Sequence, residues 1–258
     1  LANAVNGTPS AFFTQLDDSP LARVHLIIKL PESKIPKYDT AALEAEITQA
    51  TRSWSDKILD ALTERDGEAR AHELIARFKS AFGTLYQEKY SSDEVLLDLG
   101  IIEDVDTTGE IGFHLYRPND SEKNTVRFKL YSPEKQIPLS DVLPVFEHMG
   151  FKVINEGGPH EVKIADASFK RLVIHDFGLE TRNGMNIDVE SNRDNFEEAF
   201  ARVWHGDAES DGFNALVVGA GLAWREIVIL RAYCKYLRQV GITYSQTYME
   251  QTLAKHSA

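Results

Sequence analysis

The hydrophobic period changes twice along this chain, and these changes limit the folds that it can adopt. Apolar residues recur at three- and four-residue steps from about residue 40 to residue 110 and again after residue 190, which predicts amphipathic helices. Between residues 111 and 180, apolar and polar residues alternate instead, which predicts strands. We therefore expect an α+β fold, in which a helix covers one face of a sheet and further helices precede and follow it.

Residues 1–110 are expected to hold one strand and three helices. Residues 22–30 have the β-branched centre of a mostly buried strand. A long helix is expected to begin at Asp39 or Thr40, either of which could cap it, and to run to the break at residues 66–67.

Two further helices are expected before residue 110. One contains Phe82 and ends near Gly83. Ser91 and Glu94 have the spacing of a capping box, which predicts the start of a short third helix.

Residues 111–190 are expected to form four strands and one helix. The strands are residues 113–116, 125–131, 151–154 and 171–177. The helix is expected to begin near Ser140, because Pro144 is tolerated only in a first turn, and to stop at Gly150.

Residues 191–258 are expected to form a helical subdomain or connector. Asp194 and Glu197 have the spacing of a capping box that would start one helix. A longer helix is expected to stop at Gly241, and a final helix to begin at about Ser245.

The charge balance bears on the partners that the chain can bind. It has 28 basic and 40 acidic residues, a net charge of −12, and residues 1–110 alone have 11 basic and 20 acidic residues. Such a field repels phosphate backbones and anionic lipids, so we expect neither nucleic acid nor a membrane as a partner. The longest apolar runs are also far shorter than the roughly 20 residues that cross a bilayer.

Cysteine content and the first residues indicate the compartment. Cys234 is the only cysteine and lies among apolar residues, so we expect a buried thiol and no intrachain disulfide. The first residues do not have the pattern of a secretory signal, and a reducing cytoplasm is therefore expected. The chain begins at Leu1 and its first methionine is Met149, which suggests an interior piece of a longer polypeptide.

One stretch resembles a dinucleotide-binding loop. Residues 217–224 contain Gly219 and Gly221, but the third small residue of such a loop is replaced by Trp224. No complete βαβ unit follows, so a contact between helices or a turn is the favoured interpretation. We expect no cofactor-binding residue in this chain.

His175 and Asp176 are the candidate catalytic pair. They lie near the end of a predicted strand, where a histidine beside a carboxylate more often makes a structural hydrogen bond. None of the eight histidines has the spacing of a metal-binding pair, and the chain has no Gly-x-Ser-x-Gly nucleophile elbow. We therefore expect no catalytic and no metal-binding residue.

Basic residues recur on the predicted helix that ends at Gly241. Arg231, Lys235 and Arg238 share one face, and Arg225 lies one to two turns before them. This face is either a docking surface for an acidic partner or, as favoured here, a solvated face.

Nine segments of the chain together resemble one enzyme family. They are residues 19–25, 51–54, 115–118, 127–131, 138–144, 175–180, 211–214, 220–226 and 230–239. Their order and spacing are similar to those of the bacterial large NAD-specific glutamate dehydrogenases over nearly the whole chain. In that family these segments lie in the amino-terminal half, where ACT-like regulatory modules and helical motifs precede the dehydrogenase domain.

The resemblance implies three parts. Residues 1–110 correspond to the end of a first ACT-like module with a helical extension, residues 111–190 to an ACT-like (ferredoxin-like) module, and residues 191–258 to a helical subdomain. The parent enzyme is expected to convert L-glutamate, NAD and water to 2-oxoglutarate, ammonia and NADH. This segment would be regulatory or architectural, and NAD would bind elsewhere.

The resemblance also implies partners. They are the downstream catalytic domain of the same polypeptide, further copies of the parent in a homo-oligomer, and an amino-acid effector. An amino-acid sensor that uses residues 111–180 is the alternative function. Residues 132–140 lack the glycine-containing turn by which ACT modules commonly bind amino acids, which favours a scaffold. An autonomous enzyme that uses His175 and Asp176 is the third hypothesis.

Overall fold

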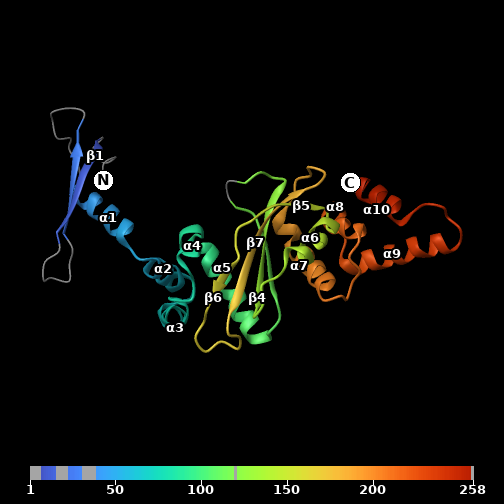
Figure 1. Cartoon of the computed structure of the whole chain (residues 1–258), viewed down its shortest axis with the longest axis horizontal. Helices are drawn as coiled ribbons and strands as arrows, with labels where there is room; N and C mark the ends of the chain where they lie inside the picture. Colours follow the sequence, from blue (N-terminus) through green and yellow to red (C-terminus); the bar gives the residue numbers. More distant parts are fainter. Residues whose placement is uncertain (1–6, 16–22, 31–38, 119–120, 257–258) are drawn as a thin grey trace. The chain divides into compact units, whose positions relative to one another are not determined.

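This computed structural model describes residues 7–15, 23–30, 39–118 and 121–256, and the chain divides into two compact units, residues 1–60 and 61–258 (Figure 1). In the first unit, β1 (Thr8–Gln15) and β2 (Arg23–Lys29) form an antiparallel sheet, and α1 (Thr40–Thr51) follows. The predicted cap of α1 is confirmed, because the Asp39 carboxylate accepts hydrogen bonds from two backbone N–H groups of its first turn.

The prediction of a mostly buried strand at residues 22–30 is wrong. Val24, Leu26 and Ile27 on β2 are each about half exposed. Among the described residues β2 pairs with β1 alone, and a two-stranded sheet cannot bury its own faces.

The predicted long helix from residue 39 to residue 66 is also wrong, because it is interrupted at Arg52 and Ser53. A separate helix, α2 (Trp54–Asp66), begins there. The Ser53 hydroxyl accepts from the Asp56 N–H at 3.1 Å, and the Asp56 carboxylate accepts from the Ser53 N–H at 3.2 Å. This reciprocal cap starts a new helix where the apolar stripe alone predicts continuation.

Three helices follow: α3 (Glu68–Phe78), α4 (Thr84–Lys89) and α5 (Ser92–Thr108). The second predicted helix therefore ends before Phe82, and α4 is an element that the sequence did not predict. The Ser91 capping box of α5 is confirmed, but this helix has 17 residues and is not short. It continues until Gly109, whose φ of 73° ends it in the left-handed region.

One antiparallel sheet lies at the centre of the second unit. Its strand order is β3 (Gly112–Tyr116), β4 (Thr125–Pro133), β7 (Leu172–Thr181) and β5 (Phe151–Glu156). The four predicted strands are thereby confirmed. A short strand that was not predicted, β6 (His160–Val162), pairs with the first residues of β7.

The connectivity is that of a ferredoxin-like module with a displaced edge strand. The run β4, α6 (Leu139–His148), β5, β7 and α7 (Val189–Trp204) gives the order βαββα. The last strand of a βαββαβ module is replaced at the sheet edge by β3, which precedes the run, and residues 205–256 contain no strand. The predicted α+β fold is confirmed.

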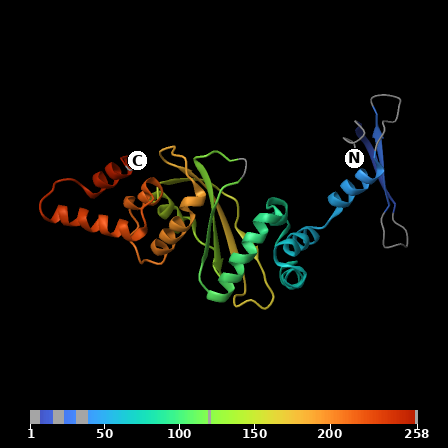
Figure 2. The ribbon, with the colours of Figure 1, turned by 180° about the vertical axis from the view of Figure 1, so that it is seen from behind.

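Helices cover both faces of the sheet. On β4, Val126, Phe128 and Leu130 belong to the core formed with α6 and α7, and the Phe128 ring lies 4.7 Å from that of Phe200 on α7. The alternate residues of β4 point to the other face, which α5 crosses (Figure 2). The alternation of side chains along β4 thus divides them between two helical layers.

Two details of α6 and α7 differ from the predictions. Pro144 is the sixth residue of α6 and so lies in its second turn. Pro144 has no N–H group, so the carbonyl of Ser140 loses its helical hydrogen bond. Both residues are exposed, and water can satisfy that carbonyl. α7 begins at Val189, and Asp194 lies inside it rather than at its start.

The last part of the chain is helical, as predicted. A 3₁₀ turn, η2 (Gly212–Ala215), leads into α8 (Leu216–Ala220), α9 (Trp224–Gln239) and α10 (Gln246–Lys255). The predicted stop at Gly241 and the predicted cap at Ser245 are confirmed. In the described part of the chain, no helix combines the length and the apolar character that crossing a bilayer requires.

Candidate functional site

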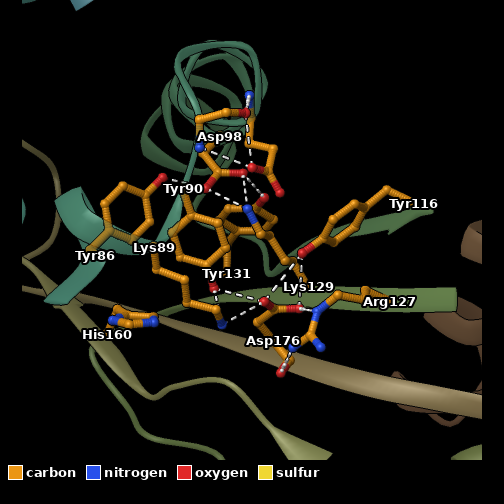
Figure 3. A network of polar contacts seen from close by, with 12 residues as sticks. Tyr86, Lys89, Tyr90, Asp98, Tyr116, Arg127, Lys129, Tyr131, His160 and Asp176 are labelled. Atoms are coloured by element: carbon orange, nitrogen blue, oxygen red, sulfur yellow. Dashed lines mark hydrogen bonds and ion pairs between the residues drawn. The ribbon is translucent and has the colours of Figure 1, made fainter. Parts of the chain in front are cut away.

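Two buried carboxylates, Asp98 on α5 and Asp176 on β7, are the centres of a polar network between α4–α5 and the sheet (Figure 3). Both residues are 0% exposed. We call this cluster the α5–sheet network. Its members are Tyr86, Lys89, Tyr90, Asp98, Tyr116, Arg127, Lys129, Tyr131 and Asp176.

Asp98 accepts hydrogen bonds from three side chains. The Lys129 ammonium donates to both carboxylate oxygens at 2.8 Å, and the Tyr131 hydroxyl donates to Oδ1 at 2.6 Å. The Tyr86 hydroxyl donates to Oδ2. Lys129 is 1% exposed, and its ammonium also lies 4.0 Å from the centre of the Tyr90 ring, in cation–π geometry. The buried charge pair is therefore fully surrounded by compensating groups.

Asp176 is held by four donors. The Arg127 Nε donates to Oδ1 at 2.8 Å, while the Tyr90 hydroxyl and the Lys89 ammonium donate to Oδ2 at 2.7 and 3.0 Å. The Tyr116 hydroxyl lies 3.2 Å from both oxygens. Each carboxylate thus receives donors from the α4–α5 side and from the sheet side.

The shifted pKa values in the network indicate a structural rather than a catalytic role. Burial alone raises the pKa of the Asp176 carboxyl, but the hydrogen bond and the charge of Arg127, with the Tyr90 hydroxyl, hold this pKa below its usual value. Burial, and then the negative charge of Asp176, raise the pKa of Tyr90 and of Tyr116. A general acid or base works best with a pKa near the working pH, and these groups are shifted away from it.

Sequence reasoning missed this network because its residues lie within regular strand and helix patterns. On β4, Arg127, Lys129 and Tyr131 alternate with large apolar residues, a pattern that predicts a solvent-facing side. Asp98 stands within the apolar stripe of α5, three residues after Val95. A carboxylate inside such a stripe is the one signal that could have revealed a buried partner.

The structure does not bring His175 and Asp176 together. They are adjacent on β7, so their side chains point to opposite faces of the sheet. The Ile137 N–H donates to His175 Nε2 at 3.1 Å, which leaves the proton of the neutral ring on Nδ1, where it is donated to Glu156 at 2.7 Å. His175 thereby holds the turn between β4 and α6, in which Glu134 adopts a φ of 65°.

The stretch that resembles a dinucleotide-binding loop has a different geometry. Residues 216–220 are helical rather than extended, and Gly221, with φ of 66°, is the turn before α9 begins at Trp224. A dinucleotide loop instead joins a strand to a helix.

Cys234 is buried as expected, and burial raises the pKa of its thiol.

The prediction that Arg231 shares a solvated or docking face with Lys235 and Arg238 is wrong for Arg231. Arg231 is 3% exposed, and its guanidinium donates to the two carboxylate oxygens of Asp211 at 2.7 and 2.9 Å. It lies on the buried stripe of α9 with Ile227, four residues earlier. Lys235 forms an ion pair at the surface, whereas Arg238 is exposed.

No group of three or more histidine, cysteine, aspartate or glutamate side chains that could hold a metal ion occurs among the described residues. The carboxylates of the network are instead bound by ammonium, guanidinium and hydroxyl donors. The arrangement can therefore fix two layers together, and its geometry shows no free base or nucleophile.

Four family models match successive parts of the chain, and all four describe domains of glutamate dehydrogenase. They are the ACT2 domain at residues 1–55, helical motif 2 at residues 61–105, the ACT3 domain at residues 110–192 and helical motif 3 at residues 208–258. The α5–sheet network therefore joins residues of helical motif 2 to residues of the ACT3 domain.

Curated relatives agree with these matches. An NAD-specific glutamate dehydrogenase of Halomonas elongata is 39% identical over 99% of the chain, and those of Pseudomonas aeruginosa and Mycobacterium tuberculosis are 31% and 28% identical over 100% of it. The chain spans 16% of the length of each of these relatives. The chain therefore corresponds to a stretch of the ACT and helical-motif domains of glutamate dehydrogenases.

Proposed function

We propose that this chain is a regulatory and architectural segment of an NAD-dependent glutamate dehydrogenase and has no chemistry of its own. In this proposal the parent enzyme converts L-glutamate, NAD and water to 2-oxoglutarate, ammonia and NADH with residues that lie outside the chain. The names of the relatives support that activity for the parent.

The α5–sheet network is the observation that carries the proposal. Asp98 comes from the segment matched by helical motif 2, and its partners Lys129 and Tyr131 come from the ACT3 domain. Asp176 comes from the ACT3 domain, and Lys89 and Tyr90 bind it from the other side. Reciprocal buried pairing of this kind fixes one layer against another, whereas a catalytic carboxylate must remain accessible to substrate.

The test is an assay of the purified chain with L-glutamate and NAD. We expect no formation of NADH by absorbance and no heat of NAD binding by calorimetry, because the carboxylates of the α5–sheet network are buried and paired and residues 216–220 are helical rather than part of a dinucleotide loop. Turnover that persists in a preparation from a second expression host would contradict the proposal.

The alternative function, an amino-acid sensor on residues 111–180, receives less support from the turn after β4. Its Glu134 N–H donates to the Arg171 carbonyl at 2.9 Å, and its Ile137 N–H donates to His175. Two of the backbone N–H groups that could bind a ligand in this turn are thus already occupied. Calorimetry with a panel of amino acids should give no saturable heat, and a saturable, stoichiometric signal would favour the sensor.

We further infer that the chain comprises the end of a first ACT-like module with a helical extension (1–110), an ACT-like module (111–190) and a helical connector (191–258). The exposed apolar side chains of β1 and β2, among them Phe12 and Leu26, support a larger first module that covers them. We also propose that the parent is a cytoplasmic homo-oligomer in which this segment contacts the catalytic domain. Sedimentation of the parent enzyme would measure its oligomeric state.

A further inference from the structure

The helices α9 and α10 and residues 240–245 between them form a hairpin (Figure 1). This hairpin carries large apolar side chains that remain exposed among the described residues. Nine of the nineteen large hydrophobic side chains that are exposed among the described residues lie in this hairpin. These nine, which we call the hairpin surface, are Val228, Ile229, Tyr233, Tyr236, Leu237, Val240, Ile242, Tyr244 and Tyr248. Ile229, Tyr233 and Tyr236 on α9 follow one another at four- and three-residue steps and so share one face, and an exposed apolar face of this kind marks an interaction site.

Both ends of the hairpin are anchored, and its middle is not. The buried residues of α9 end at Cys234, and residues 235–245 are all exposed. On α10, Met249 and Leu253 pack against the core of the second unit. Since most helical stability comes from the packing of an apolar face, the projecting turns of α9 lack the contacts that would hold them.

The chemistry of the surface indicates the kind of partner. Four of the nine residues are tyrosines, and the rings of Tyr244 and Tyr248 stack at 4.9 Å, which presents a rigid aromatic ridge. Residues 224–248 contain four basic residues and one acidic residue, and two of the four, Arg231 and Lys235, are already paired with Asp211 and Glu209. Arg225 and Arg238 are exposed and form no ion pair with a described residue.

We propose that the hairpin surface docks the remainder of the parent polypeptide, which meets it with an acidic surface that carries apolar side chains. This inference rests on the proposed function, since it requires a longer enzyme, and the relatives have most of their length outside the matched 16%. Carboxylates on the partner would complement the exposed Arg225 and Arg238, which lie near the two ends of α9. Self-association of two hairpins is disfavoured, because the same basic residues would meet in an isologous contact.

The test compares backbone hydrogen exchange in the 258-residue chain with exchange in the full-length polypeptide. We expect the amides of residues 235–245 to exchange more slowly in the full-length protein by about tenfold or more, which corresponds to ~1.4 kcal/mol of protection. Equal exchange in the two proteins would overturn the proposal.

A matched pair of double variants of the full-length protein identifies the surface. Tyr236→Ser with Leu237→Ser should abolish the protection of residues 235–245, because both side chains lie on the hairpin surface. Leu85→Ser with Leu97→Ser, which removes two exposed apolar side chains on α4 and α5, should leave it unchanged. Protection that survives the first variant would contradict the assignment of the surface.

Two further measurements separate the competing outcomes. Sedimentation of the 258-residue chain should show a monomer, and a dimer that Tyr236→Ser dissociates would replace the proposed partner with a second copy. Glutamate oxidation by the full-length protein is assayed in parallel. If that activity is missing while the protection is present, the proposed function fails and the docking site stands.

Discussion

Lys129 neutralises a carboxylate that lies wholly inside the protein. Replacing it by methionine, Lys129→Met, keeps the apolar stem but leaves Asp98 with two hydroxyl donors and no cation. Breaking a buried ion pair by removing one partner costs about 3–5 kcal/mol, so we expect a loss of that order in the free energy of unfolding measured with urea.

The matched control for that prediction is Lys163→Met. Lys163 pairs with Glu161 at the surface, and its side chain is 70% exposed. A change within about 0.5 kcal/mol is expected there, because water and salt screen the pair. Equal effects of the two substitutions would show that burial does not set the strength of the Lys129 interaction.

The lowered pKa of Asp176 predicts how the free energy of unfolding depends on pH. Its pKa is lower in the folded chain than in the unfolded chain, so its contribution to stability is present above the unfolded value of about 4 and is lost as the pH falls through the folded value. Asp176→Asn should therefore flatten the decline in the free energy of unfolding below about pH 4. An unchanged slope in urea titrations across that range would contradict the assignment.

Single residues also show where sequence reasoning ends. Cys234 was placed in the core correctly, because its apolar neighbours are local in sequence. The Asp98–Lys129 pair was not found, because its members are 31 positions apart and each lies on a face whose neighbour is unknown from sequence. Likewise, adjacency suggested a His175–Asp176 pair, but the pleat of the strand separates the two side chains.

At the scale of an element, α9 is fixed to η2 by one buried guanidinium. Arg231→Met removes the donors to Asp211 and to Asn214, which are bound at 2.7 to 2.9 Å. We expect a loss of about 2–4 kcal/mol in the free energy of unfolding, because Asp211 loses its cation in a largely buried site.

Arg238→Met on the same helix is the control for Arg231→Met. Arg238 is exposed, so a change within about 0.5 kcal/mol is expected. The two variants are compared by urea unfolding followed by far-ultraviolet circular dichroism. If both variants were neutral, the ion pair with Asp211 could not be what fixes α9.

The elements that sequence reasoning placed correctly have local signals at their ends. Asp39, Ser91 and Ser245 accept backbone N–H groups within three residues, so the caps could be read from neighbouring letters. The predicted start of α7 lies too late in the chain. Asp194 and Glu197 have capping-box spacing, but they lie inside the helix, where the backbone N–H groups are already bonded. Val189, the first residue of α7, is buried in the core shared with the sheet, so tertiary packing extends the helix beyond that local signal.

At the scale of the whole molecule, the excess of acidic residues predicts which polymers the chain avoids. With a net charge of −12, we expect no binding of duplex DNA or of anionic lipid vesicles at physiological ionic strength. Fluorescence anisotropy with labelled DNA and co-sedimentation with vesicles measure this. Saturable binding that weakens with salt would contradict the expectation, and residues 224–248 would then be the first segment to test.

The division into parts was only partly accessible from sequence. The change of hydrophobic period located the sheet correctly, since alternation and helical spacing are properties of neighbouring residues. Sequence reasoning could not predict that α4, α5 and the sheet share one interior. That interior depends on contacts such as the hydrogen bond from Tyr90 to Asp176, which are 86 positions apart.

The α5–sheet network has a consequence for recombination between genes. The border between the segments matched at residues 61–105 and 110–192 crosses the interior that both share, with Asp98 on one side and Lys129 on the other. A crossover at that border would combine Asp98 from one parent gene with the residue at position 129 from another, and the two need not form an ion pair. The two segments are therefore expected to be inherited as one cassette, and a graft of the ACT3 domain into another protein should carry α4 and α5 with it.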